Sequence, residues 1–315
     1  MIVKILPAKP TFSGVNYNTN KVDRNKGELM KVANFGPLQG LGKLRPQDYV
    51  NYLKMVSAQN KNISKPQFHA VISAKGKSYD KHALTTIAVA WLKEMGYGSQ
   101  PYLIVYHKDT DNNHVHMVST RVDRDGIKIP SDFEHRRAVK NINKALGYDF
   151  GLQYKFSTRA QFLTILENKG YLGTDPDEKK IQERINKYRP DKVRSAEIKN
   201  ILQQYKNAVG FEILLKSRYD IDLVFHAAEG KRPYGYSIID HETKQVFKGS
   251  EVLPLKELLN ASEGNPANHD TEPQQTEDTT VPAYIQSIRI SDDVDDQQVH
   301  GMKRRRQRKA RTNTR

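Results

Sequence analysis

The sequence predicts an α+β fold, in which short strands and amphipathic helices share one chain. Three stretches support this class. Residues 67–74 (QFHAVISA) alternate in polarity as a strand does, and residues 82–98 follow with apolar residues at helical spacing and a glycine stop. Residues 101–109 and 114–122 are apolar strands around the acidic turn DTDNN, so together they predict a β-hairpin.

The other elements follow along the chain. Residues 1–6 are a short strand-like run, and residues 13–22 are rich in Gly and Asn, which favours a loop or the end of a strand. Pro46 stands at the start of the helical pattern over residues 45–60, and proline there suits a helix N-terminus. Further helices are expected over residues 45–60, 134–147, 157–172 and 175–208.

The amino-acid composition changes twice in the last third of the chain. Residues 208–227 predict a helix running into a strand, and residues 234–252 predict a β-hairpin, which together would form a small α/β module. Residues 261–298 are rich in Asp, Glu, Gln, Thr and Pro and cannot bury enough apolar surface to fold alone. Dense positive charge over residues 302–315 then predicts a disordered arm that binds nucleic acid.

The composition indicates the partner and the compartment. The chain has 51 Lys and Arg against 36 Asp and Glu, a formal net charge of +15, which favours a nucleic acid as partner. The absence of cysteine excludes disulfides and thiolate metal sites. We see neither a secretory signal nor an apolar run of about 18 residues, so we expect a cytoplasmic protein without membrane insertion.

Three histidines lie on the predicted hairpin. His114 and His116 are two residues apart on a strand, so both imidazoles project from one face. His107 lies on the adjacent antiparallel strand, close to where pairing would bring it opposite them. Three imidazoles then converge as ligands for a divalent ion and leave coordination positions open for a substrate, as in catalytic sites. Asp109 or Asp111 would orient a ring nitrogen of one ligand.

Two other interpretations of the histidines stay open. They could be exposed side chains of a polar hairpin without a ligand. They could also bind zinc in a hydrolase, although the chain has no H-E-x-x-H motif and no thiol ligand.

The hairpin resembles the third motif of relaxases, the mobilization nucleases of the HUH endonuclease class. The motif here is His107-x-Asp109-x-Asp111-Asn112-x-His114-Val115-His116. Two earlier stretches resemble the first and second motifs: GVNYNTNKV has Tyr17 in the place of the nucleophilic tyrosine, and HAVISAKGKS has Ser73 at the position that contacts DNA. The order and the spacing match over about residues 1–160, and the resemblance is less specific to about residue 260.

The resemblance implies a fold and a reaction. The fold would be a central antiparallel sheet with helices packed behind it, its central strands being 102–107 and 114–121. Tyr17 would attack a DNA phosphodiester at an origin of transfer, forming a 5′-phosphotyrosine, and the strand would later be rejoined. A divalent ion would be held by His107, His114 and His116, with Mg²⁺ or Mn²⁺ expected and Zn²⁺, Ni²⁺ or Co²⁺ as alternatives. The partners would be single-stranded DNA, accessory relaxosome proteins and a coupling protein of a plasmid or integrative element.

The chain would then divide into a nuclease domain over residues 1–160, a helical and small α/β extension over residues 161–260, and the tail over residues 261–315.

Several other residues are candidates for the same site. A tyrosine hydroxyl has a free pKa near 10 and needs activation, so Asp80 and Asp109 are candidates for its proton acceptor. Asp80 could equally be a helix N-cap, and Tyr17 could instead be a loop tyrosine that stacks on a base. His69 is either a strand histidine near the site or a core histidine. The candidates for a DNA groove, each of which could also belong to a solvated face, are Lys21, Arg121, Arg124, Lys128, Arg136 and Arg137.

Two alternative functions remain beside the relaxase. A rolling-circle replication initiator would use the same chemistry, but the chain is short for an attached helicase and lacks a G-x-x-x-x-G-K-[ST] motif. A non-catalytic single-stranded DNA-binding protein could retain the hairpin and its metal without cleaving.

Overall fold

The computed structural model describes residues 1–42, 44–228 and 230–259. These residues form two compact units. The first unit contains Met1–Asp149 and Tyr171–Asp175, and the second contains Phe150–Gly170 and the described residues from Pro176 onward. The predicted tail, residues 261–315, lies outside the described residues, and the domain boundaries predicted at residues 160 and 260 stay predictions.

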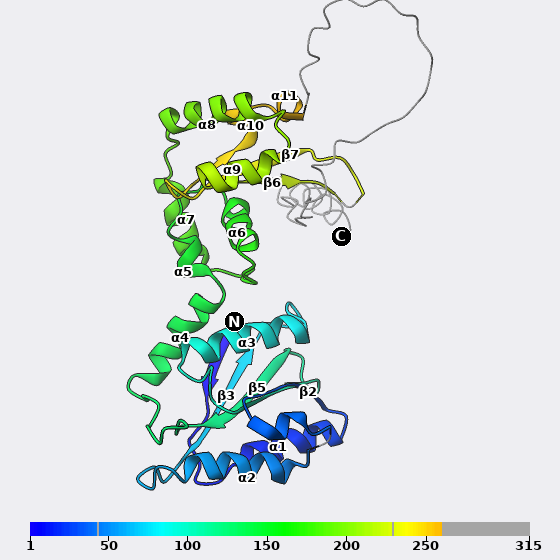
Figure 1. Cartoon of the computed structure of the whole chain (residues 1–315), viewed down its shortest axis with the longest axis vertical. Helices are drawn as coiled ribbons and strands as arrows, with labels where there is room; N and C mark the ends of the chain where they lie inside the picture. Colours follow the sequence, from blue (N-terminus) through cyan, green and yellow to red (C-terminus); the bar gives the residue numbers. More distant parts are fainter. Residues whose placement is uncertain (43, 229, 260–315) are drawn as a thin grey trace, which may run out of the picture. The chain divides into compact units, whose positions relative to one another are not determined.

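The first unit is built on a five-stranded antiparallel sheet, as the fold class predicts (Figure 1). The strand order is β1-β3-β5-β4-β2, so β5 lies at the centre and β4 and β3 flank it. The bounds are β1 Ile2–Ile5, β2 Gly27–Ala33, β3 Gln67–Ser73, β4 Tyr102–His107 and β5 His114–Thr120. The edge strand β2 was not predicted, because its sequence GELMKVA shows little regular alternation of polar and apolar residues. In the structure, a bulge near Leu29 interrupts this strand.

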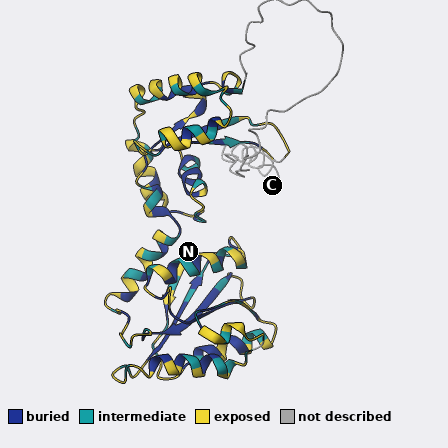
Figure 2. Cartoon of the chain, in the orientation of Figure 1, coloured by how far each residue is buried: buried dark blue, intermediate teal, exposed yellow. Residues whose placement is uncertain are grey.

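Helices cover both faces of this sheet, whereas the resemblance implied that they lie behind it. Helices α1 (Ser13–Asp23) and α2 (Pro46–Ser57) share a buried cluster with Leu103 of β4 and Val118 of β5. Phe68 of β3 faces the other way and stacks on Trp91 of helix α3 (Lys81–Glu94), which packs against α4 (Glu134–Ala145). Figure 1 shows α3 on the opposite side of the sheet from α1 and α2, and Figure 2 shows the buried strands between them.

The second unit contains the predicted α/β module. A three-stranded antiparallel sheet has the order β6-β7-β8, and the helix running into a strand and the hairpin both lie where the sequence predicts them. Ile238 of β7, Phe211 of α9 and Ile198 of α8 belong to one buried cluster. The bounds in this unit are α6 Arg159–Asn168, α7 Glu178–Lys187, α8 Lys192–Tyr205, α9 Phe211–Tyr219, β6 Ile221–His226, β7 Gly235–Asp240, β8 Gln245–Lys248, α10 Gly249–Val252 and α11 Leu255–Leu259. The short helix α5, Tyr148–Gly151, includes residues of both units, and a short 3-10 helix in the first unit covers Gly36–Gly40.

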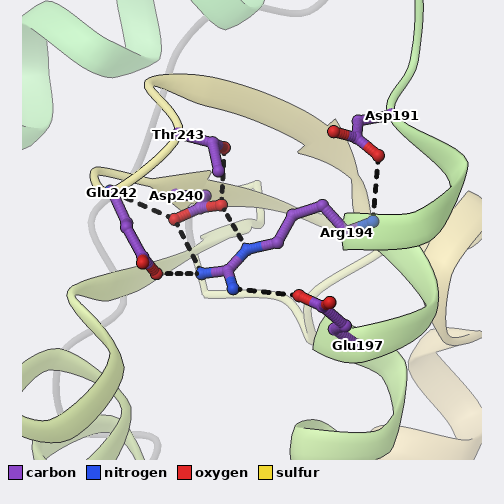
Figure 3. Close-up of polar contacts among 6 residues, drawn as sticks. All are labelled: Asp191, Arg194, Glu197, Asp240, Glu242 and Thr243. Carbon is purple, nitrogen blue, oxygen red and sulfur yellow. Dashed lines mark hydrogen bonds and ion pairs between the residues drawn. The ribbon is translucent and has the colours of Figure 1, made fainter.

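One arginine ties α8 to the turn of the β7–β8 hairpin (Figure 3). The Arg194 guanidinium donates to Asp240 at 2.8 and 3.3 Å, and it also donates to Glu242 and Glu197. The Asp240 side chain has no exposed surface, so this carboxylate depends on the arginine for its charge partner. Asp191 begins the helix by accepting a hydrogen bond from the Arg194 backbone N–H.

Candidate functional site

The three hairpin histidines meet on one face of the sheet. His107 pairs with His114 across β4 and β5, and Val105 pairs with His116, so the alternation of both strands points the three imidazoles to the same side. The ring of His107 lies 4.1 Å from that of His116 and 5.1 Å from that of His114. One nitrogen from each ring lies within 4.8 Å of the other two, so the cluster could hold a metal ion.

Two of the rings are fixed by neutral hydrogen-bond partners. Nδ1 of His114 lies 3.0 Å from the carbonyl oxygen of Asn112, so Nδ1 carries a proton and donates it to this oxygen. Nδ1 of His116 lies 2.9 Å from Nε2 of His69, which is buried on β3. His69 is thus both a buried residue and a neighbour of the site, and it combines the two roles that the sequence left as alternatives.

Burial keeps two of these histidines neutral. Removal from water is the main cause that lowers the pKa of His107 to about 4 and the pKa of His116 to about 2. The same cause lowers the pKa of His69 to about 4. Neutral imidazole is the form that binds a metal, so His107 and His116 are ready to coordinate an ion at neutral pH without first losing protons.

Tyr17 lies on a helix, whereas the sequence predicted a loop or the end of a strand. Its glycine and asparagines are weak helix formers, but tertiary contacts override that preference because Phe12 and Val15 are buried against the sheet. The Tyr17 ring lies 5.8 Å from the His107 ring and 5.9 Å from the His116 ring. With 49% of its surface exposed, the tyrosine borders the histidine cluster and remains accessible from solvent.

Asn18 is the residue that the sequence analysis missed. It follows Tyr17 in α1, is buried, and places Oδ1 2.8 Å from Nε2 of His107. Helical periodicity would assign Asn18 to the buried face of a helix, but the sequence of residues 13–22 was interpreted as a loop or the end of a strand.

Within the described residues, no hydrogen bond joins Asp109 to a histidine ring. Its carboxylate forms an ion pair with Lys21, which lies one helical turn after Tyr17 in α1. The hydrogen bond from Lys21 lowers the pKa of Asp109, and the same contact raises the pKa of Lys21. Asp109 is therefore held as a charged partner of Lys21, a poor arrangement for a proton acceptor. The Lys21 ammonium lies 5.8 Å from the Tyr17 ring centroid, so it adds positive charge beside the phenol.

One candidate lies in the second motif and another just after it, and the structure gives them different positions. Asp80 caps α3, where its carboxylate accepts a hydrogen bond from the Ala83 backbone N–H at 2.7 Å, which is the alternative that its sequence position left open. Ser73 pairs with His114 in the β3–β5 ladder and therefore lies on the same face as the histidines.

The histidine cluster does not include the basic candidates Arg121, Arg124 and Lys128. Arg121 is buried and bonded to Glu134 at 2.8 Å, so its guanidinium is occupied inside the protein and we remove it from the DNA-contact residues. Arg124 and Lys128 are exposed, but they follow the C-terminal end of β5 whereas the histidines begin that strand. A seven-residue strand separates the two ends by about 20 Å.

A polar cavity of about 460 Å³ lies at the tip of the hairpin. Residues of both charge signs line it, namely Lys77, Tyr106, Lys108, Asp109, Thr110, Asp111 and Asn113. Tyr106 donates to the Asn113 side chain at 2.6 Å and faces away from the histidines, as strand alternation requires.

A histidine–apolar–histidine pair on the central strand, with a third histidine opposite and a tyrosine beside them, defines the class of HUH nucleases. The comparison with protein families gives a match within this class. Residues 17–152 match the family model described as "Relaxase: MobA/VirD2-like, nuclease domain", so this part of the chain is similar to the nuclease domain of relaxases, the mobilization nucleases. A relaxase nuclease domain nicks DNA for mobilization. Among curated proteins, no significant match is found.

The family is consistent with two further observations. Relaxases of the HUH type generally use a divalent metal, and His107, His114 and His116 could bind one. Within the described residues, no helix is both long enough and apolar enough to cross a membrane.

Proposed function

We propose that this protein nicks one strand of DNA at an origin of transfer by attack of the Tyr17 hydroxyl, for mobilization or conjugative transfer of a plasmid or integrative element. The observation that carries the proposal is the place of Tyr17, whose ring lies within 6 Å of the rings of both His107 and His116. A half-exposed tyrosine at this position can meet a phosphate that approaches the histidine cluster from solvent.

The residues present fit a divalent ion. Three imidazoles converge from two strands, and those of His107 and His116 are held neutral by burial. Their hydrogen bonds to protein groups fix the ring orientations before an ion binds. When bound, a divalent ion would polarise a phosphate oxygen and neutralise charge that develops in the transition state. Mg²⁺ or Mn²⁺ is the ion that we propose.

The reaction exchanges one phosphodiester for another. A bond forms between the Tyr17 phenol oxygen and the phosphorus, and the bond between the phosphorus and the 3′-oxygen breaks. The tyrosine loses its proton, and the leaving 3′-oxygen gains one. The products are a 5′-phosphotyrosine and a free 3′-hydroxyl. Because the bonds formed and broken are of the same kind, the step is close to balanced in free energy, and the same site can rejoin the strand without ATP.

Other residues of the chain would bind the DNA substrate and the partner proteins. Ser73 and Lys21 border the cluster and are the proposed contacts to single-stranded DNA near the scissile phosphate. Arg124 and Lys128 would contact a more distant part of the DNA. We place the nuclease activity in the first unit, and we propose that the second unit and residues 261–315 engage DNA, accessory relaxosome proteins or a coupling protein.

A covalent-adduct assay tests the proposal. The full chain is incubated with Mn²⁺ and single-stranded DNA from the region beside its own coding sequence, and the products are separated on a denaturing gel. We expect a DNA-linked protein band that disappears with chelator and in Tyr17→Phe but persists in Tyr52→Phe, which removes a phenol hydroxyl from α2. Cleaved DNA without a linked protein would contradict tyrosine attack and indicate hydrolysis.

A further inference from the structure

The side chain of Asn18 joins the helix that carries Tyr17 to a histidine of the cluster. Its amide nitrogen donates to the backbone carbonyl of Gly14 at 2.7 Å, one turn earlier in α1. Because a carbonyl only accepts, this contact fixes which end of the amide is nitrogen. The amide oxygen therefore faces Nε2 of His107, 2.8 Å away. An oxygen that only accepts must receive a proton from the ring, so His107 carries its proton on Nε2.

A second contact holds the first turn of α1 against the same cluster. The Gly14 backbone N–H donates to the side chain of Gln67 at 2.7 Å. A Cβ atom at Gly14 would lie 2.9 Å from both the Gln67 Oε1 and the Nδ1 of His69, so only glycine permits this approach. His69 in turn contacts His116. Helix α1 is thus connected to the histidine cluster through two routes, one ending at His107 and the other at His116.

We propose that Asn18 is a positioning residue that fixes the ring of His107 for metal binding and couples the bound metal to the helix carrying Tyr17. The inference rests on the proposed function for the metal and for Tyr17. Metal-binding histidines commonly donate their second ring N–H to a protein acceptor, and loss of such an acceptor typically lowers metal affinity. Asn18 directly follows Tyr17 in the chain and supplies this acceptor to His107, so Tyr17 and His107 move together.

The route to His107 depends on the side chain of Asn18. Its neighbour Thr19 is also on the buried side of α1, but its hydroxyl donates only to the helix backbone, to the carbonyl oxygens of Val15 at 3.1 Å and Asn16 at 3.2 Å. Thr19→Val therefore removes a buried polar group from the same helix without touching a histidine. Asn18→Leu removes the acceptor of His107. Asn18→Asp keeps an oxygen facing the ring, replaces the donor to Gly14 by a second acceptor and adds a negative charge.

The test measures Mn²⁺ affinity of the full chain by titration calorimetry, together with the rate of adduct formation. We expect Asn18→Leu to weaken Mn²⁺ binding by about 10- to 100-fold, with Asn18→Asp and Thr19→Val close to wild type. Mn²⁺ binding by Asn18→Leu equal to wild type would overturn the inference. Equal losses in the Leu and Asp variants would also overturn it, because the Asp variant keeps an acceptor facing the His107 ring.

A second measurement needs no variant of Asn18. Nitrogen-15 NMR of the histidine rings in the metal-free protein, assigned through loss of signals in His107→Ala, should show His107 with its proton on Nε2 and His114 with its proton on Nδ1. A His107 protonated on Nδ1 would refute the inference even if Asn18→Leu did not fold. A failure of the proposed function would give a different result. The wild type would then form no covalent adduct, whereas Asn18→Leu would still lose Mn²⁺ affinity. In that case Asn18 keeps its role and the proposed nicking reaction is wrong.

Discussion

The guanidinium of Arg121 donates to both carboxylate oxygens of Glu134, at 2.8 and 2.9 Å, and both side chains are buried in the first unit. Breaking a buried ion pair by removing one partner leaves an uncompensated charge. We therefore expect Arg121→Met to lower the free energy of unfolding by about 3 kcal/mol, measured by urea denaturation.

The double variant separates this structural role from a role in DNA binding. Replacing both partners, as Arg121→Met with Glu134→Leu, removes both charges and should recover most of the lost stability. DNA binding by the double variant should keep the salt dependence of the wild type. If the double variant were stable but bound single-stranded DNA with a weaker salt dependence, Arg121 would be a phosphate contact after all.

Gly14→Ala should disturb the site through packing alone. The added methyl would lie 2.9 Å from the side chains of Gln67 and His69, so α1 or those side chains must shift. We expect a loss of about 1–3 kcal/mol in the free energy of unfolding and a lower rate of adduct formation. Gly40→Ala is the matched control, because a Cβ there meets nothing within 4 Å. Equal adduct rates in the two variants would mean that the position of α1 does not limit the reaction.

The buried histidines make stability depend on pH. The folded pKa values of His107 and His69 are about 4, and burial is the main cause of both shifts. These values lie below the ordinary histidine pKa of about 6.5, so the unfolded chain binds more protons between the two values and stability falls as the pH falls through this window. In chelator, we expect the free energy of unfolding to drop by about 2 kcal/mol or more from pH 7 to pH 5.

A variant tests the assignment of this pH dependence. His69→Gln removes one of the buried imidazoles and should make the stability profile between pH 7 and pH 5 less steep. A profile that is flat in the wild type, or unchanged in His69→Gln, would show that these rings are protonated in the folded protein as readily as in the unfolded chain.

The sequence predicted those parts of the site that follow from strand geometry. Because side chains alternate on a strand, the spacing of His114 and His116 and the hairpin turn were enough to bring His107 to the same face. The helix carrying Tyr17 was not predicted, because its stability comes from contacts with the sheet, which local propensity does not report. For the same reason, the partners of Asp109 and Arg121 could not be read from the sequence, since Lys21 and Glu134 reach them only in the folded chain.

The ion pair between Lys21 and Asp109 yields two predictions of opposite sign. Lys21→Met removes a cation beside Tyr17 and leaves Asp109 unpaired, so it should weaken binding of single-stranded DNA and reduce the salt slope by about 1. Asp109→Asn releases the ammonium and should strengthen binding. Filter binding at several salt concentrations measures both, with the exposed Lys93→Met as the charge-matched control. If Asp109 instead accepts the tyrosine proton, Asp109→Asn should abolish the covalent adduct while DNA binding persists, and our account of this pair would be wrong.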